Sequence, residues 1–435
     1  MSFQFGCSKV DITPDYPVYL CGYGARNCLS KGVEEPLEAG VFIVTGNRKR
    51  QIHVTLDSTG LSAADCDRLK TDVAKKSGCS VAELIISCSH THFAPGVEEY
   101  YVTFPNGELE MGVHPRDEKY YRLLVKQISK AVKAAEANLE PATVEEAEIM
   151  LPELLFNRRT VRKSDGMVDT NYIYPKNDAD YDFQEADPEL MVWRFCTKSG
   201  IKAIVGRYSA HPVTGGSEFY NISADYPGYF KKYVQEYCGC PAFFLLGTNG
   251  DAVPIRRQGS SRSDIGAIMA LAIRLAELRF RKAPDFHVGI AKLPLQLKLR
   301  VTTDRNTVDA EFEKRLAAAK KKTKSDDEFR FFGYRREFVK MYPSDDVTLE
   351  MNIARLGSKV LVFLPFEVLT EIGTRLKKEC PNAEIISISN GYDGYLPLAK
   401  EYKRGGYEAT WGPRFHKTAG DEILRLAVKA VKELD

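Results

Sequence analysis

The sequence predicts an α/β protein with a mixed β-sheet core flanked by helices. Short apolar runs rich in β-branched residues, such as residues 84–88, alternate with longer segments of helical periodicity, such as residues 118–137. Residues 190–195 and 201–208 read as an antiparallel hairpin, which favours a mixed sheet over a purely parallel one. Polar residues follow many of the predicted strands, where open α/β sheets place their sites.

Length and composition indicate an ordinary globular protein. The chain has 435 residues, of which 44% are apolar and 28% are charged. Two or three domains would fit this length, but large α/β enzymes also fold as one unit, and we expect one domain over residues 1–435. The net charge of +2 gives no basic excess, so we expect no nucleic-acid partner.

Targeting features point to a cytoplasmic protein. The N-terminal residues lack the basic and apolar regions of a signal peptide, and no apolar run approaches the ~20 residues of a membrane span. We therefore expect no stable membrane insertion. The ten cysteines lack CxxC spacing, and we interpret them as reduced thiols.

The first part of the chain alternates strands and helices. Ser62 is an N-cap type of residue and Gly78 a stop signal, so they bracket a helix. A second helix carries apolar residues at helical spacing, from Tyr121 to Val132. In order, we predict strands at residues 9–14, 37–44 and 51–56, a helix at 62–76, a strand at 84–92, a helix at 118–137 and a strand at 141–151.

The second part begins with the hairpin and ends in a helix. The charged segment at residues 303–343 predicts a helical arm whose default role is a solvated face. Around it, we predict a helix from about residue 222 to 237, a strand at 242–246, a helix at 263–281, strands at 360–364 and 385–389, and a closing helix at 417–434.

Six polar positions lie just past predicted strands, and we expect them at one edge of the sheet. The first motif among them is His90-Thr-His92. Residues i and i+2 of a strand point the same way, so both imidazoles can face one cavity, where they suit a divalent metal. A pair of hydrogen-bonded loop histidines is the alternative. The six positions are Asp57, His90, His211, Asn249 with Asp251, Glu367 and Asn390.

Five segments in order carry a resemblance to a known family. They are HTHFAPG, SAHPVTG followed by ISADYPGY, GTNGDAVP, and the tyrosine-rich tail from NGYDGY to WGP. With these motifs the chain resembles the catalytic domain of the neutral/alkaline, non-lysosomal ceramidases, over most of its length. The resemblance implies a zinc-dependent amide hydrolase, here without the family's C-terminal β-sandwich.

The resemblance also implies a role for individual residues. It implies one zinc ion per chain, held by four ligands. It also implies four further residues that take part in catalysis. Two histidines, a glutamate and a phenolate-like tyrosine suit zinc and leave room for water or a carbonyl. A tyrosine such as Tyr407 would donate to the developing oxyanion. The implied ligands are His90, His211, Glu367 and Tyr395, and the implied catalytic residues are His92, Arg158, Tyr407 and Asp251.

One departure from the family pattern changes the expected mechanism. The family's GDxSP serine, a proposed nucleophile, is replaced by Val253 in GDAVP. Valine cannot attack a carbonyl, so we expect zinc-bound water to attack directly, with Asp251, Asp225 or His92 as the base. The expected substrate is a small soluble molecule with a linear amide, such as an N-acyl amino sugar.

Three other functions stay open at this point. Carboxylic-ester hydrolysis is the nearest one. A two-metal phosphoesterase would use Asp57, with Asp225, to complete a second metal site, although turn and N-cap roles explain both residues equally well. A non-catalytic binding protein that keeps the fold would explain the missing serine. Substrate identity and a possible homo-oligomer are not decided by the sequence.

Overall fold

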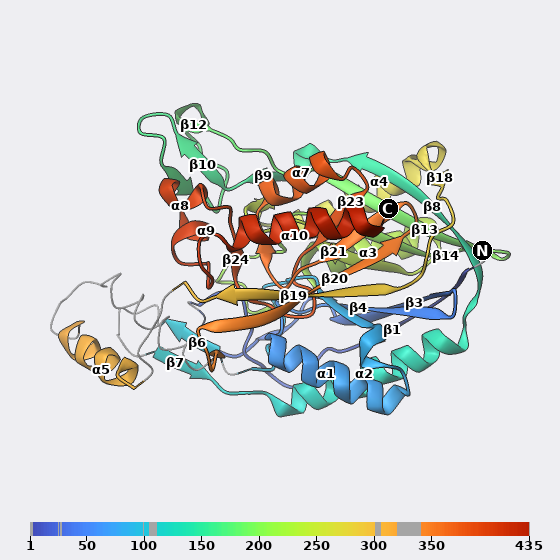
Figure 1. The fold of residues 1–435 in the computed structure, drawn as a ribbon, viewed down its shortest axis with the longest axis horizontal. Helices are drawn as coiled ribbons and strands as arrows, with labels where there is room; N and C mark the ends of the chain where they lie inside the picture. The colour runs from blue at the N-terminus through green and yellow to red at the C-terminus, as the bar shows by residue number, and fades with distance from the viewer. Residues whose placement is uncertain are drawn as a thin grey trace.

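The computed structural model describes residues 3–24, 26, 28–98, 100–103, 111–300, 306–319 and 341–434. Two β-sheets pack face to face, and helices cover the outer face of each one (Figure 1). The predicted class, a mixed sheet flanked by helices, is confirmed.

The larger sheet is mixed. It contains β1 (Phe3–Asp11), β3 (Glu38–Gly46), β4 (Lys49–Leu56), β5 (Leu84–Cys88), β8 (Glu140–Met150), β13 (Glu189–Thr197), β14 (Gly200–Tyr208), β16 (Ala242–Leu246) and β18 (Arg281–Lys282). The order is β16-β14-β13-β8-β1-β3-β4-β5, with β18 also paired to β8. Only two of these pairings, β4 with β5 and β14 with β16, are parallel. The predicted hairpin is β13–β14.

The smaller sheet has the order β19-β20-β21-β23. Its strands are β19 (Ile290–Lys298), β20 (Asp346–Leu356), β21 (Lys359–Phe363) and β23 (Ala383–Ile386). Short pairs lie outside the two sheets: β2 (Gly32–Val33) with β15 (Asn221–Ile222), β6 (Tyr100–Thr103) with β7 (Met111–His114), β9 (Leu155–Asn157) with β17 (Ala252–Pro254), and β22 (Glu367–Val368) with β24 (Tyr395–Leu396). A three-stranded flap joins β10 (Arg159–Arg162) to β11 (Val168–Thr170) and β12 (Tyr181–Asp182).

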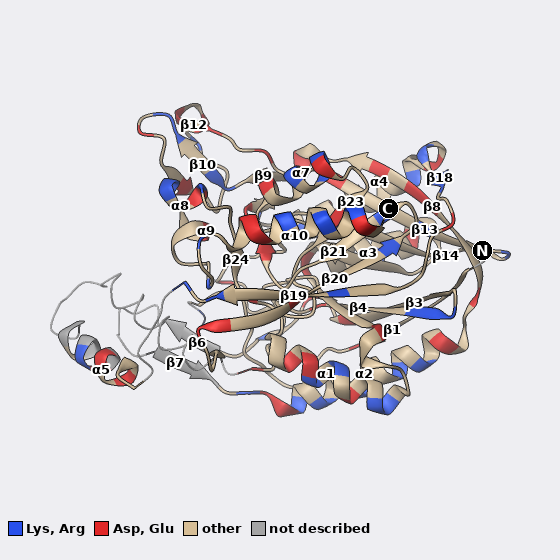
Figure 2. Cartoon of the chain, viewed as in Figure 1, with Lys and Arg blue, Asp and Glu red and all other residues tan. Residues whose placement is uncertain are grey.

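Helices pack on both outer faces. On the larger sheet lie α1 (Ala63–Ser77), α2 (Glu118–Ala137), α3 (Asp225–Cys238) and α4 (Ser261–Leu275), and on the smaller sheet α7 (Thr370–Glu379) and α10 (Ala419–Leu434). Basic and acidic residues are interspersed along α1, α2 and α10 (Figure 2). The other α-helices among the described residues are α5 (Val308–Ala319), α8 (Glu401–Arg404) and α9 (Tyr407–Thr410).

Local signals explain the helix ends that matter here. The Ser62 side chain accepts from the Asp65 amide at the start of α1, and Gly78 ends that helix with a φ of 85°. Asp117 caps α2 in the same way. The predicted apolar stripe of α2 is buried from Tyr121 to Val132. Both helices therefore form where the sequence predicts them.

The core between the sheets is aromatic. Phe42 and Trp193 of the larger sheet pack in one cluster with Phe363 of the smaller sheet. The Trp193 indole donates across the interface to the carbonyl oxygen of Leu356, at 3.1 Å. Alternate residues of β3 face this core or the helices, because successive strand residues point to opposite faces. One apolar layer therefore joins the two sheets.

Several predicted bounds differ from the structure. Strand β5 ends at Cys88 rather than at residue 92, and α4 ends at Leu275, before the predicted residue 281. Helix α5 lies within the predicted arm, while residues 303–305 and 320–340 of that arm are outside the described residues. Among the described residues, no helix is both long and apolar enough to cross a bilayer.

Candidate functional site

Three predicted ligands converge although they are far apart in the sequence. His90 follows β5, His211 follows β14, and Glu367 opens β22. The Nε2 atom of His211 lies 2.8 Å from Oε2 of Glu367, and that of His90 lies 3.4 Å from the same oxygen. His90 and Glu367 are each 1% exposed, and His211 is fully buried. We call these three residues the ligand cluster.

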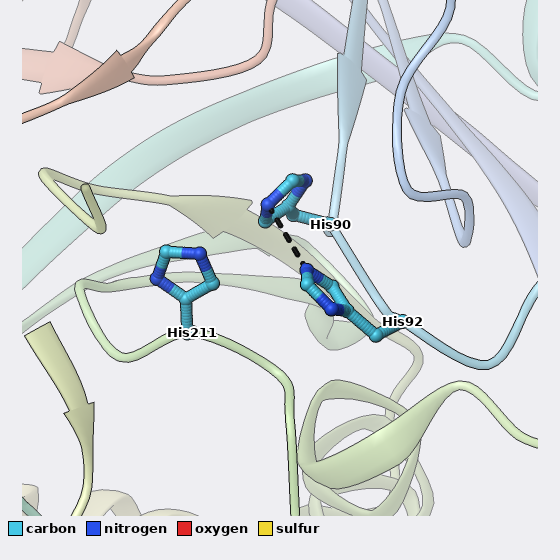
Figure 3. Close-up of side chains that lie close together, drawn as sticks. All are labelled: His90, His92 and His211. Carbon is cyan, nitrogen blue, oxygen red and sulfur yellow. Dashed lines mark hydrogen bonds between the residues drawn. The ribbon is translucent and has the colours of Figure 1, made fainter. Parts of the chain in front are cut away.

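His92 joins this group from the same loop as His90. Its Nε2 lies 3.3 Å from Nε2 of His90, and Figure 3 shows the two rings and that of His211 turned toward one another. Ligand atoms of the three histidines all lie within 4.8 Å of one another. The structure thus brings together all the histidines to which the sequence analysis gave a role.

The geometry that brings His90 and His92 together is not the one predicted. The two residues lie beyond the end of β5, and His90 has a φ of 66°, which is left-handed backbone. A hydrogen bond from the His90 amide to the carbonyl oxygen of Ser58 fixes this turn at 2.8 Å. The i, i+2 rule for strands therefore does not apply, and a turn supplies the convergence instead.

Backbone carbonyls set the orientation of both ligand histidines. Nδ1 of His90 bonds to the carbonyl oxygen of Thr59, and Nδ1 of His211 to that of Asn249. A carbonyl oxygen only accepts, so each Nδ1 carries the proton and each Nε2 presents a lone pair to the ligand cluster. This is the arrangement by which proteins orient histidine ligands of metals.

The charge state of the cluster fits a cation. Burial lowers the pKa of His211 to about 4, so the ring is neutral at pH 7. Burial opposes ionisation of Glu367, so this carboxylate needs positive charge nearby, and neutral imidazole rings do not supply it. Among the described residues, neither Nε2 of His211 nor Oε2 of Glu367 has a hydrogen-bond partner. Two buried acceptors that face each other are costly without a cation between them.

Two tyrosines approach Glu367 in different ways. The Tyr392 hydroxyl donates to Oε1 of Glu367 at 2.6 Å, which orients the carboxylate. Tyr395 lies directly beside Glu367, because β22 and β24 pair in parallel with these residues in register. Its hydroxyl accepts from Nη2 of Arg158 at 2.9 Å. Burial and the nearby Glu367 raise the pKa of Tyr395 well above its usual range, against the opposing effect of Arg158, so the hydroxyl is protonated here and its ligand role stays a prediction.

Two of the predicted catalytic residues lie around Tyr395. The Tyr407 ring packs edge-on against that of Tyr395, with centroids 5.4 Å apart. Arg158 is 4% exposed, and its Nε bonds to Oε1 of Glu408 at 2.6 Å. Sequence reasoning did not identify Glu408, because no local pattern links it to an arginine 250 positions away.

Asp251 is engaged in other contacts. Its Oδ1 accepts from the amide and the hydroxyl of Thr370, and its Oδ2 accepts from Asn157. These bonds join the loop after β16 to the start of α7, which is a structural task. The role of Asp251 as a base stays a prediction, and it would require this carboxylate to give up established partners.

The two aspartates considered for a second metal site are also occupied. Oδ2 of Asp57 pairs with the Lys231 ammonium at 2.6 Å. The carboxylate of Asp225 accepts from the amide and hydroxyl of Thr214 at 2.9 and 2.7 Å. Among the described residues, the side chains grouped closely enough to hold a metal ion are the three histidines, and neither aspartate belongs to that group.

Val253 is a packing residue in this structure. It is fully buried and forms a small apolar cluster with Phe156 and Val213, against which Tyr23 packs. Tyr23 in turn lies edge-on to His92, with ring centroids 5.0 Å apart. The position of the family serine is therefore filled by a side chain that supports the site without a reactive group.

Comparison with known proteins identifies the family. Residues 3–238, more than half of the chain, match the family described as neutral/alkaline non-lysosomal ceramidase, N-terminal. The chain belongs to this family. Membership implies amide hydrolysis, and it confirms the resemblance found in the sequence motifs. A comparison with curated proteins finds no match.

Solved structures show the same fold. Neutral ceramidase from Pseudomonas aeruginosa aligns with all of this chain and with 75% of its own, at 17% identity and a TM-score of 0.72. A ceramidase complexed with C2 aligns with 99% of this chain and 75% of its own, at 16% identity and the same TM-score. At these identities the likeness carries the fold alone.

Proposed function

We propose that this protein is a zinc-dependent hydrolase that removes the N-acyl group from a small substrate with a linear amide. The observation that carries the proposal is the ligand cluster, in which the Nε2 atoms of two histidines converge on one oxygen of a buried carboxylate. His90, His211, Glu367 and Tyr395 would hold one zinc ion. Zinc bound there would polarise the amide carbonyl and lower the pKa of water.

The protein's own residues divide the remaining work. Because Val253 has no nucleophilic atom, water is the attacking group, and the bond that breaks releases a carboxylic acid and an amine. Burial lowers the pKa of His92 well below its usual range, so this ring is neutral at pH 7 and keeps one unprotonated nitrogen. Of the three bases considered, His92 is the one whose ring faces the ligand cluster. Tyr407 would donate to the oxyanion and Arg158 would orient Tyr395.

Other functions have less support. Ester hydrolysis uses the same groups and stays the close variant. The contacts of Asp57 with Lys231 and of Asp225 with Thr214 give no support to a two-metal phosphoesterase. A cytoplasmic location is part of the proposal, supported by ten free thiols.

The test is turnover under control of the metal. Purified protein is stripped with a chelator, reloaded with zinc, and assayed with N-acyl amino sugars and with esters of the same acids. We expect the zinc-loaded protein to cleave the amides and release acid and amine. This activity should be lost when the metal is stripped and should return when zinc is added. Zinc-loaded protein that releases no amine from any N-acyl compound would contradict the proposal.

A further inference from the structure

Two adjacent buried arginines lie between the ligand cluster and the flap. Arg158 and Arg159 follow β9 and are 4% and 0% exposed. Both bind Glu408 of α9: Nε of Arg158 lies 2.6 Å from Oε1, and Nη1 of Arg159 lies 3.2 Å from Oε2. Glu408 is itself fully buried. A buried carboxylate that forms ion pairs with two guanidinium groups is fixed in position by them, and it fixes the positions of both guanidinium groups.

The same guanidinium that Glu408 binds also reaches Tyr395, the residue paired with Glu367 in β22–β24. Nη2 of Arg158 donates to the Tyr395 hydroxyl at 2.9 Å and to the carbonyl oxygen of Gly250 at 3.0 Å. The guanidinium is planar, so a bond at Nε fixes the direction of the N–H groups at Nη2. Tyr395 is the neighbour of Glu367 in the β22–β24 pair.

Glu408 has a second connection to the site. Thr170 of β11 donates its hydroxyl to Oε2 of Glu408 at 3.0 Å, and the same hydroxyl oxygen accepts from the amide of Tyr407 at 2.9 Å. The carboxylate is thus linked, through one intermediate each, to the hydroxyl of Tyr395 and to the backbone amide of Tyr407. Glu408 lies on the segment after β24, and its partners lie just after β9 and on the flap; among the described residues, the flap has no strand pairing with the segment after β24.

We propose that Glu408 is a positioning residue: it holds the Arg158 guanidinium against the Tyr395 hydroxyl and so directs Tyr395 to the ligand cluster. This inference rests on the proposed function only for its effect on turnover. Its effect on the metal site can be measured with metal alone.

Glu401 provides a matched control. It is 2% exposed and binds Nη2 of Arg159 at 2.7 Å, and the part of the chain that the structure describes shows no hydrogen bond between it and Arg158. Replacing either glutamate by glutamine therefore removes one buried charge that faces Arg159. Only Glu408→Gln also disturbs the partner of Tyr395, so any difference between the two variants reports positioning rather than loss of a buried ion pair.

The experiment compares both variants by three readouts. They are the visible absorption spectrum of the protein loaded with Co²⁺, the kcat and KM for an N-acyl substrate, and the midpoint of thermal unfolding. For Glu408→Gln we expect an altered Co²⁺ spectrum and a fall in kcat of about tenfold or more, with KM within about twofold. For Glu401→Gln we expect the Co²⁺ spectrum and kcat to stay unchanged. The unfolding midpoint should fall by a similar amount in both variants, because each loses one buried charge.

A double variant shows whether Glu408 acts through Tyr395. In Tyr395→Phe the hydroxyl is absent, so adding Glu408→Gln should change the Co²⁺ spectrum no further. Glu408→Asp, which keeps the charge, should recover part of the effect, and it replaces Glu408→Gln if that variant fails to fold. Equal spectra for the Glu408 and Glu401 variants would overturn the proposal. Absence of turnover in the unaltered protein would contradict the proposed function instead, and would leave the spectral comparison valid.

Discussion

Two backbone carbonyls decide what the histidines of this site can do. Because Thr59 and Asn249 each accept from an Nδ1 atom, His90 and His211 present unprotonated Nε2 atoms to Glu367. His92 differs, since its Nδ1 is buried without a hydrogen-bond partner among the described residues. This contrast separates two predicted ligands, each held in one tautomer, from a third ring whose Nδ1 has no such constraint.

The contrast predicts different outcomes for His92 and for the ligands. In His92→Ala, we expect zinc content to stay near that of the unaltered protein while kcat falls by about 10²-fold or more, because a proton acceptor is lost. Metal analysis and kinetics on the same preparation check this. Loss of zinc from His92→Ala would show that this ring is a ligand instead.

A substitution at Val253 tests whether a serine at this position would act as a nucleophile. Val253→Ser places a hydroxyl in the apolar cluster of Phe156 and Val213, and we expect the free energy of unfolding to fall by about 1–3 kcal/mol. We expect no gain in kcat, because the site uses water. Urea unfolding and turnover measure the two effects, with Val253→Ala as the control for lost volume. A rise in kcat for the serine variant alone would contradict a water-only mechanism.

At the scale of elements, the turn before β3 packs a carboxyl against α3. Glu35 is buried with Oε2 close to Gly228 of α3, since a Cβ added at Gly228 would lie 2.5 Å from that oxygen. Burial, with Asp57 nearby, raises the pKa of Glu35 to about 9 from the ordinary 4.5. The folded state therefore holds a proton that the unfolded chain releases above pH 4.5, so this group's contribution to stability decreases as pH rises toward 9.

Glu35→Gln should remove that pH dependence. Glutamine resembles the protonated acid, so we expect the variant to gain stability over the unaltered protein by about 1 kcal/mol or more between pH 5 and pH 8. Urea unfolding of both proteins at several pH values measures the difference. A difference that is constant over this range would show that Glu35 is ionised in the folded protein.

The elements that sequence predicted best are those with a local signal. Helices α1 and α2 have caps and apolar stripes, and the polar positions after β5, β14 and β21 marked three members of the ligand cluster. The contacts of Arg158 and Arg159 with Glu408 and Glu401 had no such signal, because their partners lie more than 240 positions away. The turn at His90 was also missed, since nothing in the tripeptide His-Thr-His distinguishes a strand from left-handed backbone.

On the scale of the whole molecule, an aromatic layer packs the two sheets against each other. A fully buried Phe363 and the Trp193 indole, which bonds to Leu356 of the other sheet, belong to this layer. The sequence showed the buried strands but not that two sheets would face each other, because a run buried on both faces does not reveal what covers it. This packing places Glu367, which follows the smaller sheet, beside histidines that follow the larger one.

The shared layer predicts a single unfolding transition. We expect Phe363→Ala to lower the free energy of unfolding by about 3–5 kcal/mol, because it leaves a cavity between the sheets. Tryptophan fluorescence and far-UV circular dichroism should still report one coincident transition in urea. Two separate transitions in the variant or in the unaltered protein would show that the sheets unfold independently.

Elemental analysis of the purified protein beside His90→Ala and His211→Ala tests the central claim most directly. The account predicts one zinc per chain in the unaltered protein and its loss in both variants, since each removes an Nε2 lone pair that faces Glu367. Folding of the variants is checked by circular dichroism. An unaltered protein that binds no zinc even when zinc is supplied, with both variants folded and indistinguishable from it, would contradict the account.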